Sequence, residues 1–138
     1  MHDASIILTY QGEMLEKRVN PLAQKINSPA IFECDVSSEE SVIDTFDKIS
    51  KDFGKIDFLV HAIAFSDKDQ LKGKYIETTR ENFLKTMDIS CYSFTSVARS
   101  ASKIMKPGGS IITLTYLGAE KVIPHYNVMG IAKAALES

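Results

Sequence analysis

The sequence predicts an α/β protein built on a doubly wound sheet of parallel strands. Four short runs are almost continuously apolar and rich in Ile, Val or Phe, as is typical of strands covered on both faces. These runs lie at residues 5–10, 31–36, 56–65 and 110–116. The segments between them carry apolar residues at helical spacing, and strands that alternate with helices form a parallel sheet with right-handed crossovers.

The first helical segment covers residues 14–26 and follows the first apolar run. Its apolar residues recur at helical spacing: Leu15, Val19, Leu22 and Ile26. Pro21 lacks a backbone N–H, so we expect it to divide this segment or to restart it with Asn20 as the N-cap.

The second helix is expected directly after the second apolar run. Ser37 and Glu40 form a candidate capping box, in which each side chain satisfies a backbone N–H of the first turn. One apolar face follows: Val42, Phe46 and Ile49. Gly54 is expected to end the helix.

A long helix is predicted between the third and fourth apolar runs. Thr78 and Glu81 repeat the capping-box pattern at its start. One stripe of apolar residues follows: Phe83, Met87, Cys91, Phe94, Ala98, Ala101 and Met105. The Lys-Pro-Gly-Gly sequence at 106–109 is expected to end the helix. The polar segment 66–74 is expected to be an exposed loop at the carboxyl end of a strand, the edge at which open α/β sheets bind ligands.

Composition and charge exclude several classes of function. The 138 residues are 25% charged with a net charge of -2, and no dense run of Lys or Arg occurs, so nucleic acid is not an expected partner. No apolar run reaches the roughly 18 residues of a membrane span, and the first residues do not resemble a signal peptide. Cys34 and Cys91 lie far apart, which indicates reduced thiols. We therefore expect a cytoplasmic protein.

A metal site is not predicted. His61 and His125 have no carboxylate or cysteine at the spacing of metal ligands. His61 lies within the third apolar run and is expected to be a core histidine.

The predicted elements amount to part of a domain. A dinucleotide-binding sheet normally begins with a strand that leads into a Gly-rich turn, and no such turn precedes Ser5. The last predicted helix, 127–138, is followed by no strand. We therefore expect residues 1–138 to form one partial dinucleotide-binding domain that lacks the first strand and the C-terminal portion, with no second domain. The free chain is expected to be marginally stable or oligomeric, because the absent strand would leave strand edges exposed.

Tyr126 and Lys133 are the strongest candidates for chemistry. Seven helical residues turn through about 700°, which places the two side chains on one face. An ammonium beside a phenol favours the phenolate, so we expect Lys133 to lower the pKa of Tyr126 and to assist proton donation to an oxyanion. Tyr116 ends the fourth apolar run, at the same edge of the sheet. On spacing alone, a surface tyrosine and a solvated lysine are the commoner explanation.

The residues around this pair carry a family resemblance. Residues 114–137 read LTYLGAEKVIPHYNVMGIAKAALE, with Gly130 where most short-chain dehydrogenases/reductases have the lysine, four residues after the tyrosine. This segment closely resembles the active-site segment of the enoyl-acyl carrier protein reductases of bacterial type II fatty-acid synthesis, a divergent group of that superfamily with the longer spacing. The resemblance continues through YQGE (10–13), CDV (34–36), DFLVHAIAFS (57–66), LKGKY (71–75), TTRENF (78–83) and MDISCYSF (87–94).

The resemblance implies a Rossmann-like fold and the NADH-dependent reduction of the trans-2 double bond of an enoyl thioester. Tyr126 would hydrogen-bond the thioester carbonyl, Lys133 would hold the nicotinamide ribose, and Tyr116 would lie at the same pocket. An apolar wall for the acyl chain would include Ala64, Phe65 and Met129 beside Tyr116. The remaining cofactor residues would be Gln11 near the adenosine ribose, Asp35 and Val36 at the adenine, and Ile63 and Leu114 at the strand ends.

Each of these roles has a simpler alternative when the residue is taken by itself. Asp35 fits a cap of the turn before Ser37, Phe65 and Met129 fit a hydrophobic core, and Gln11 fits a solvated side chain. Gln11 also bears on the cofactor, because an NADP site usually offers a cation at this point and a common NAD site an acid. Position 11 has neither, and NADH is the expected cofactor.

Three functional hypotheses remain open. The chain derives from an NADH-dependent enoyl-acyl carrier protein reductase, is a non-catalytic fragment or remnant of one, or is a short-chain reductase that acts on a ketone or alcohol. The long Tyr–Lys spacing argues against the third. The resemblance further implies enoyl-acyl carrier protein as the substrate partner and a homotetramer, with subunit contacts from the helix around Ser90.

Overall fold

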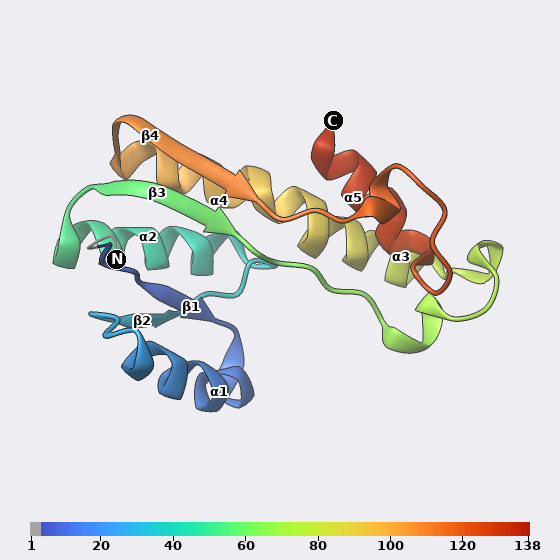
Figure 1. Ribbon diagram of the computed structural model, residues 1–138, viewed down its shortest axis with the longest axis horizontal. Helices are drawn as coiled ribbons and strands as arrows, with labels where there is room; N and C mark the ends of the chain where they lie inside the picture. The colour runs from blue at the N-terminus through green and yellow to red at the C-terminus, as the bar shows by residue number, and fades with distance from the viewer. Residues whose placement is uncertain (1–3) are drawn as a thin grey trace. The chain divides into compact units, whose positions relative to one another are not determined.

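The computed structural model describes residues 4–138, which fall into two compact units that divide between Phe53 and Gly54 (Figure 1). In both units the strands pair in parallel and alternate with helices. The predicted α/β class with parallel strands is therefore confirmed. The strands form two separate pairs, β1 with β2 and β3 with β4.

Unit 1 contains two strands and two helices. In chain order they are β1 (Leu8–Tyr10), α1 (Gly12–Lys25), β2 (Ile31–Glu33) and α2 (Glu39–Phe53). Thr9 lies opposite Phe32 in the parallel ladder, and the Phe32 and Phe53 rings pack edge to face with their centroids 6.4 Å apart. The buried apolar residues of this unit are Ala23 of α1, Cys34 after β2, and Val42, Phe46 and Ile49 of α2. The predicted apolar face of α1 is largely exposed, at Leu15, Leu22 and Ile26.

The first helix does not break at Pro21. The prediction of a division or restart there was wrong, because α1 runs without interruption from Gly12 to Lys25. A proline removes the hydrogen bond to the carbonyl four residues earlier, here that of Lys17. Both residues are exposed, so solvent can hydrate this carbonyl and the helix continues.

The N-cap of α2 lies one residue later than predicted. The Ser38 hydroxyl, not that of Ser37, accepts a hydrogen bond from the backbone N–H of Ser41 at 3.2 Å. Ser37 lies one residue before the N-cap, where its hydroxyl donates to the Asp35 carboxylate at 2.6 Å.

Unit 2 contains the other two strands and the long helical segment. Its strands and longer helices are β3 (Ile56–His61), α3 (Arg80–Met87), α4 (Ser93–Ile104), β4 (Met105–Thr113) and α5 (Asn127–Glu137). A π-helical turn, η3 (Asp88–Tyr92), joins α3 to α4, so the predicted long helix is present with one π-turn inside it. Three short 3-10 turns complete the unit: η1 (Lys68–Leu71), η2 (Tyr75–Glu77) and η4 (Leu117–Ala119).

The N-cap of α3 also lies one residue later than predicted. Thr79, not Thr78, accepts from the backbone N–H of Asn82. Thr78 instead closes the preceding turn, where its N–H donates to the Tyr75 carbonyl at 3.0 Å.

The β3–β4 pair places its carboxyl ends beside α5. His61 lies opposite Thr113, and the register is irregular between Ile56 and Phe58. Both strands end before the predicted runs do, at His61 rather than 65 and at Thr113 rather than 116. β4 also begins earlier than predicted, because α4 ends at Ile104 and Met105 already pairs with Ile56. Residues 106–109 then lie outside the ladder until Ser110 pairs with Phe58, with Gly108 in the left-handed region at φ 81°.

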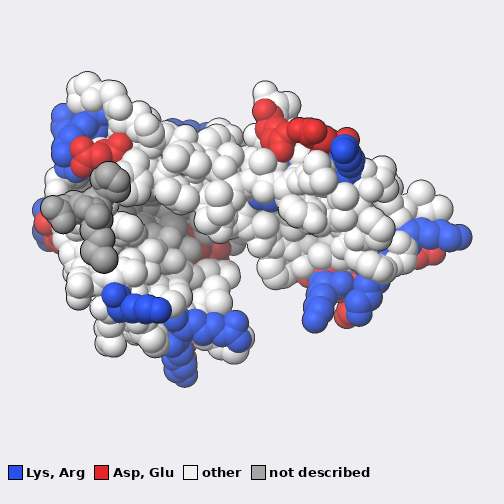
Figure 2. All heavy atoms as spheres, in the orientation of Figure 1, with Lys and Arg blue, Asp and Glu red and all other residues white. Residues whose placement is uncertain are grey.

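The core of unit 2 lies between the helices and the strand pair. α4 packs on β3 and β4, and α5 packs on η3 and η4. The buried apolar residues of these helices are Val97, Ala101, Val128, Met129 and Ala132. Figure 2 shows both signs of charge side by side on the visible face, with uncharged areas between them. Across the described residues, no helix combines the length and apolar character that a membrane crossing requires.

Candidate functional site

Lys133 is buried at the carboxyl ends of β3 and β4. Its side chain is only 5% exposed, and its ammonium donates to the Leu114 carbonyl at 2.8 Å and to the Ile63 carbonyl at 3.3 Å. Burial lowers the pKa of Lys133. An ammonium has three donors, so one N–H remains for a ligand. The structure therefore joins Ile63, Leu114 and Lys133, three of the predicted cofactor residues, through the main chain of the strand ends.

Tyr116 and Tyr126 lie against each other next to this lysine's helix. Their ring centroids are 5.0 Å apart in an edge-to-face arrangement, with Tyr126 at the N-cap of α5. Burial raises the pKa of Tyr126, and the phenol of Tyr116 raises it further. The expectation that Lys133 would lower this pKa was wrong, because the ammonium is directed to the two carbonyls. Tyr126 thus remains a protonated hydrogen-bond donor at neutral pH.

Two glycines, which the sequence does not single out as site residues, set the position of the Tyr126 ring. A Cβ on Gly118 would lie closer to the Tyr126 ring carbons than carbon atoms can approach, and a Cβ on Gly130 would lie 2.8 Å from the Gly118 carbonyl oxygen. Gly130 is thus the residue that lets the turn η4 approach α5. The only signal in the sequence is glycine at the position where related proteins with the shorter spacing have lysine.

Gly118→Ala is expected to displace the Tyr126 ring and to destabilise the fold by about 1–3 kcal/mol through overpacking. The displaced phenol should ionise nearer to its ordinary pKa of 10.0, because burial now raises it. Ultraviolet titration of the tyrosines checks this shift. Gly54→Ala is the control, because its Cβ meets open space and only the backbone at φ 76° is strained. An unchanged titration in Gly118→Ala would show that the ring does not depend on this glycine.

His61 is the core histidine that the sequence predicts, at 1% exposure. Its Nε2 lies 2.8 Å from the Ser93 hydroxyl, which itself donates to the Ile89 carbonyl at 2.6 Å. Ser93 must therefore accept from Nε2–H, which leaves Nδ1 to accept from the Thr113 hydroxyl at 2.9 Å. The His61 carbonyl accepts from the N–H of Leu114 at 3.0 Å, so the main chain of His61 supports the residue that holds Lys133.

Acidification is expected to destabilise the fold through His61. Burial, with the Lys133 ammonium, lowers the pKa of His61 from 6.5 to about 4. Between these values the unfolded chain binds more protons, so stability falls as the pH falls, by roughly 3 kcal/mol at most. Urea unfolding from pH 7 to pH 4 measures this slope. His61→Gln should flatten it and His125→Gln should leave it intact, whereas equal slopes in all three proteins would contradict the assignment.

The predicted acyl-chain residues differ in their accessibility. Ala64 is exposed and Phe65 is 41% exposed, with the Lys85 ammonium 4.6 Å from the Phe65 ring centre. Met129 is buried at 6% exposure and packs in the core of α5. Ala64, Phe65 and Tyr116 are therefore open to a ligand, while Met129 lies beneath the surface.

The predicted adenosine residues meet in unit 1, at the carboxyl ends of β1 and β2. The Gln11 amide donates to Asp35 Oδ2 at 3.2 Å. Asp35 Oδ1 accepts from both the hydroxyl and the N–H of Ser37, and these bonds lower the pKa of Asp35. Val36 follows, half-buried. Asp35 holds the turn at Ser37, as the simpler alternative proposes. Its Oδ2 also accepts from Gln11, the predicted cofactor residue that follows β1.

The fold and the arrangement in unit 2 define a class of protein. Parallel strands, a tyrosine at the start of the following helix and a buried lysine seven residues later are the pattern of the divergent short-chain dehydrogenases/reductases. The family model described as "Enoyl-(Acyl carrier protein) reductase" matches residues 1–138. The chain belongs to this family.

Individual relatives agree with this membership. The chain is 58% identical over 135 residues to an NADH enoyl-acyl carrier protein reductase of Rhizobium meliloti, which covers 98% of this chain and 50% of the relative. A Rickettsia felis NADH enoyl-acyl carrier protein reductase is 54% identical, over 99% of this chain and 53% of the relative. The chain spans about half the length of the curated relatives it matches.

Solved structures show the same fold. The Anaplasma phagocytophilum enoyl-acyl carrier protein reductase, solved in complex with NAD, has a TM-score of 0.92 and 54% identity, over 96% of this chain and 51% of that one. The Aquifex aeolicus NADH enoyl-acyl carrier protein reductase has a TM-score of 0.93 and 45% identity, over 96% of this chain and 53% of that one. The Rossmann-like expectation is confirmed.

Proposed function

We propose that this chain carries the catalytic tyrosine and lysine of an NADH-dependent enoyl-acyl carrier protein reductase. The observation that carries the proposal is Lys133, buried on two main-chain carbonyls with one N–H to spare, on the same helix as a Tyr126 that burial keeps protonated. The proposed reaction is supported by the 58% identity of the chain to an NADH enoyl-acyl carrier protein reductase.

The residues of unit 2 fit the nicotinamide end of the cofactor. NADH, when bound, would supply a hydride to the β-carbon of the enoyl thioester. The free N–H of Lys133 would donate to the ribose hydroxyls. The Tyr126 hydroxyl would donate a hydrogen bond to the thioester carbonyl oxygen and stabilise the negative charge that develops there. Tyr116, Ala64 and Phe65 would exclude water from the acyl chain, with Met129 supporting them from the core.

The residues of unit 1 fit the adenosine end. The free lone pairs of Asp35 Oδ2 and the Gln11 amide offer both acceptor and donor groups for ribose hydroxyls and the adenine, with Val36 as an apolar contact. Gln11 brings no positive charge for an extra phosphate, which favours NADH over NADPH.

The family resemblance supports the remaining parts of the proposal. Residues 1–138 would belong to a single dinucleotide-binding domain. The protein would act in the cytoplasm as a homotetramer, on an enoyl chain that is carried by acyl carrier protein.

Activity is tested with a hybrid reductase, in which residues 1–138 replace the matching half of the Rhizobium meliloti relative, beside the 138-residue chain itself. We expect the hybrid to oxidise NADH when crotonyl thioester is added, and a ketone substrate to give no reaction. Circular dichroism and NADH binding confirm that the hybrid is folded. A folded hybrid that binds NADH without reducing the thioester would favour the non-catalytic alternative, and preferred reduction of the ketone would favour the other short-chain reductases.

A further inference from the structure

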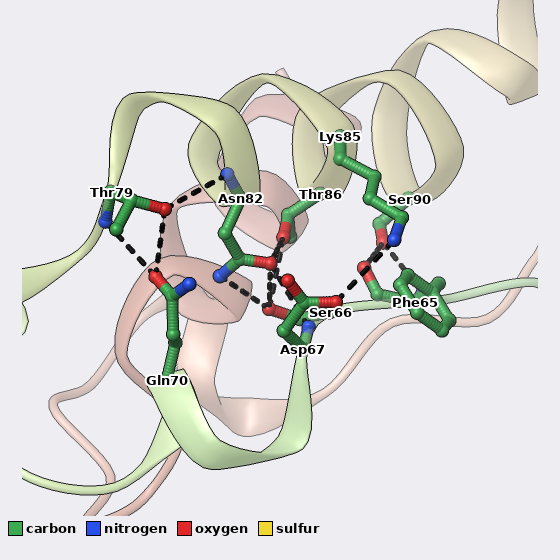
Figure 3. A network of polar contacts seen from close by, with 9 residues as sticks. All are labelled: Phe65, Ser66, Asp67, Gln70, Thr79, Asn82, Lys85, Thr86 and Ser90. Carbon is green, nitrogen blue, oxygen red and sulfur yellow. Dashed lines mark hydrogen bonds and ion pairs between the residues drawn. The ribbon is translucent and has the colours of Figure 1, made fainter.

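Three fully buried polar side chains hold the segment that follows β3. Asn82 and Thr86 of α3 and Ser90 of η3 are each 0% exposed and lie four residues apart along one helical stripe (Figure 3). The chain at 63–67 has left the sheet after His61, so its backbone groups have no strand partner. The stripe faces this segment, as the side chains in Figure 3 show.

The hydrogen bonds connect successive residues of the helical stripe to successive residues of the segment. The Ser90 hydroxyl accepts from the N–H of Phe65 at 2.9 Å and donates to its carbonyl at 3.0 Å. The Thr86 hydroxyl donates to the Ser66 hydroxyl at 2.9 Å. Asn82 donates to the same hydroxyl at 3.1 Å and accepts from the N–H of Asp67 at 2.9 Å. Each step back along the helix thus meets a later residue of the segment, and we call this set the 82–86–90 clamp.

The exposed end of the segment is fastened as well. The Lys85 ammonium lies 3.4 Å from the Asp67 carboxylate and also lies over the Phe65 ring. Thr79, the N-cap of α3, donates through its N–H and its hydroxyl to the Gln70 side-chain oxygen. These surface contacts are solvated and contribute little alone. The buried clamp is therefore the part that fixes the segment.

The clamp leaves the neighbouring side chains free to meet a ligand. The helix side chains satisfy the backbone of Phe65 and the N–H of Asp67, while the side chains of Ala64 and Phe65 stay exposed, the Phe65 ring beside the Lys85 ammonium. The same segment supplies the Ile63 carbonyl to Lys133. Burial of three polar side chains without solvent is costly unless every group is paired, so a change in one member shifts the segment.

We infer that Asn82, with Thr86, is a positioning residue for the enoyl chain: through Ser66 and the N–H of Asp67 it fixes where Phe65 and Ala64 meet the acyl group. This inference rests on the proposed function. Asn82 acts on the cofactor less than on the acyl chain, because Lys133 has its shorter bond to Leu114, outside the clamped segment.

The test compares four variants. Asn82→Ala removes the donor to Ser66 and the acceptor of Asp67, Thr86→Val removes one hydroxyl at constant shape, and Thr86→Ser restores it. Thr95→Val is the matched control, since Thr95 is exposed on α4. Amide exchange in the full 138-residue chain follows the Asp67 N–H, with the Val60 N–H of β3 as an internal reference. The hybrid reductase gives the KM for crotonyl thioester, kcat and the NADH dissociation constant.

We expect the Asp67 amide to exchange at least tenfold faster in Asn82→Ala, with Val60 unchanged. The KM for the thioester should rise about tenfold in Asn82→Ala and about threefold in Thr86→Val, with kcat and NADH affinity within twofold, and Thr86→Ser should match the parent. Faster exchange with an unchanged KM, or an equal rise in KM and in the NADH dissociation constant, would overturn the inference. An inactive parent hybrid would instead overturn the proposed function, and with it the role in acyl binding.

Discussion

Tyr126→Phe is expected to slow the reduction of crotonyl thioester by the hybrid reductase by about 10²–10³, the usual effect of removing one donor to an oxyanion. The ring and its edge-to-face contact with Tyr116 remain, so the fold is preserved and only the hydroxyl is lost. Because this hydroxyl acts on the thioester and not on the cofactor, the loss should fall on kcat while the NADH dissociation constant changes little. Steady-state kinetics and fluorescence titration of NADH measure the two quantities separately.

Tyr92→Phe is the matched control for this change. Tyr92 lies on η3 at 44% exposure, and its variant should keep turnover within about twofold of the parent. A Tyr126→Phe protein with parent-like turnover would remove Tyr126 from the reaction and leave the proposal without its proton donor.

Lys133→Met is expected to weaken NADH binding by about tenfold to a hundredfold and to lower turnover as well. The estimate follows from the loss of one hydrogen bond from a charged donor, which contributes roughly 1.5–3 kcal/mol. Methionine keeps the length of the buried chain, so the effect reports the ammonium rather than a cavity. Isothermal titration with NADH gives the dissociation constant.

The free energy of unfolding of Lys133→Met is expected to change less than the loss of two buried hydrogen bonds alone would suggest. Burial lowers the pKa of Lys133, which shows that the fold disfavours its charge, so removing the charge offsets part of the loss of the Ile63 and Leu114 bonds. Lys103→Met, on the exposed side of α4, controls for the loss of one positive charge. Unchanged NADH affinity in Lys133→Met would exclude the ribose role.

The elements of this fold were predictable because their signals are local. Continuous apolar runs located the four strands of the described residues, and apolar stripes located α1, α2 and the helical segment that contains η3. Boundaries were less predictable where two residues competed for one role. Ser37 and Ser38 are both suitable caps; in the structure Ser38 accepts from the N–H of Ser41, while Ser37 bonds to Asp35.

The candidate site was predictable where a family resemblance covers it. The spacing of Tyr126 and Lys133 puts them on one helix face, and the resemblance of residues 114–137 marks them as site residues. The electrostatic relation between them was not predictable, because it depends on the Leu114 and Ile63 carbonyls that a distant part of the chain supplies. Gly118 was equally hidden, since a glycine shows its role only through the ring that lies against it.

The clamp residues were hidden for a different reason. Asn82, Thr86 and Ser90 are polar residues on a helix, and a pattern of hydrophobicity assigns such residues to the solvent-exposed face. In the structure they are among the most completely buried side chains of unit 2. Their burial depends on the polar backbone of 65–67, which no local periodicity reveals.

The π-turn η3 lets this helical segment carry one residue more than a regular helix of the same span. A π-turn turns less per residue than an α-helix, so α3 and α4 keep nearly the relative facing of a regular helix that is one residue shorter. With α4 kept on the sheet by Val97 and Ala101, Asn82 and Thr86 therefore face the segment that they hold. Loss of one residue inside η3, such as Cys91, would thus disturb the clamp less than loss of one residue from α3 between Asn82 and Thr86, which would rotate the two side chains apart by about 100°.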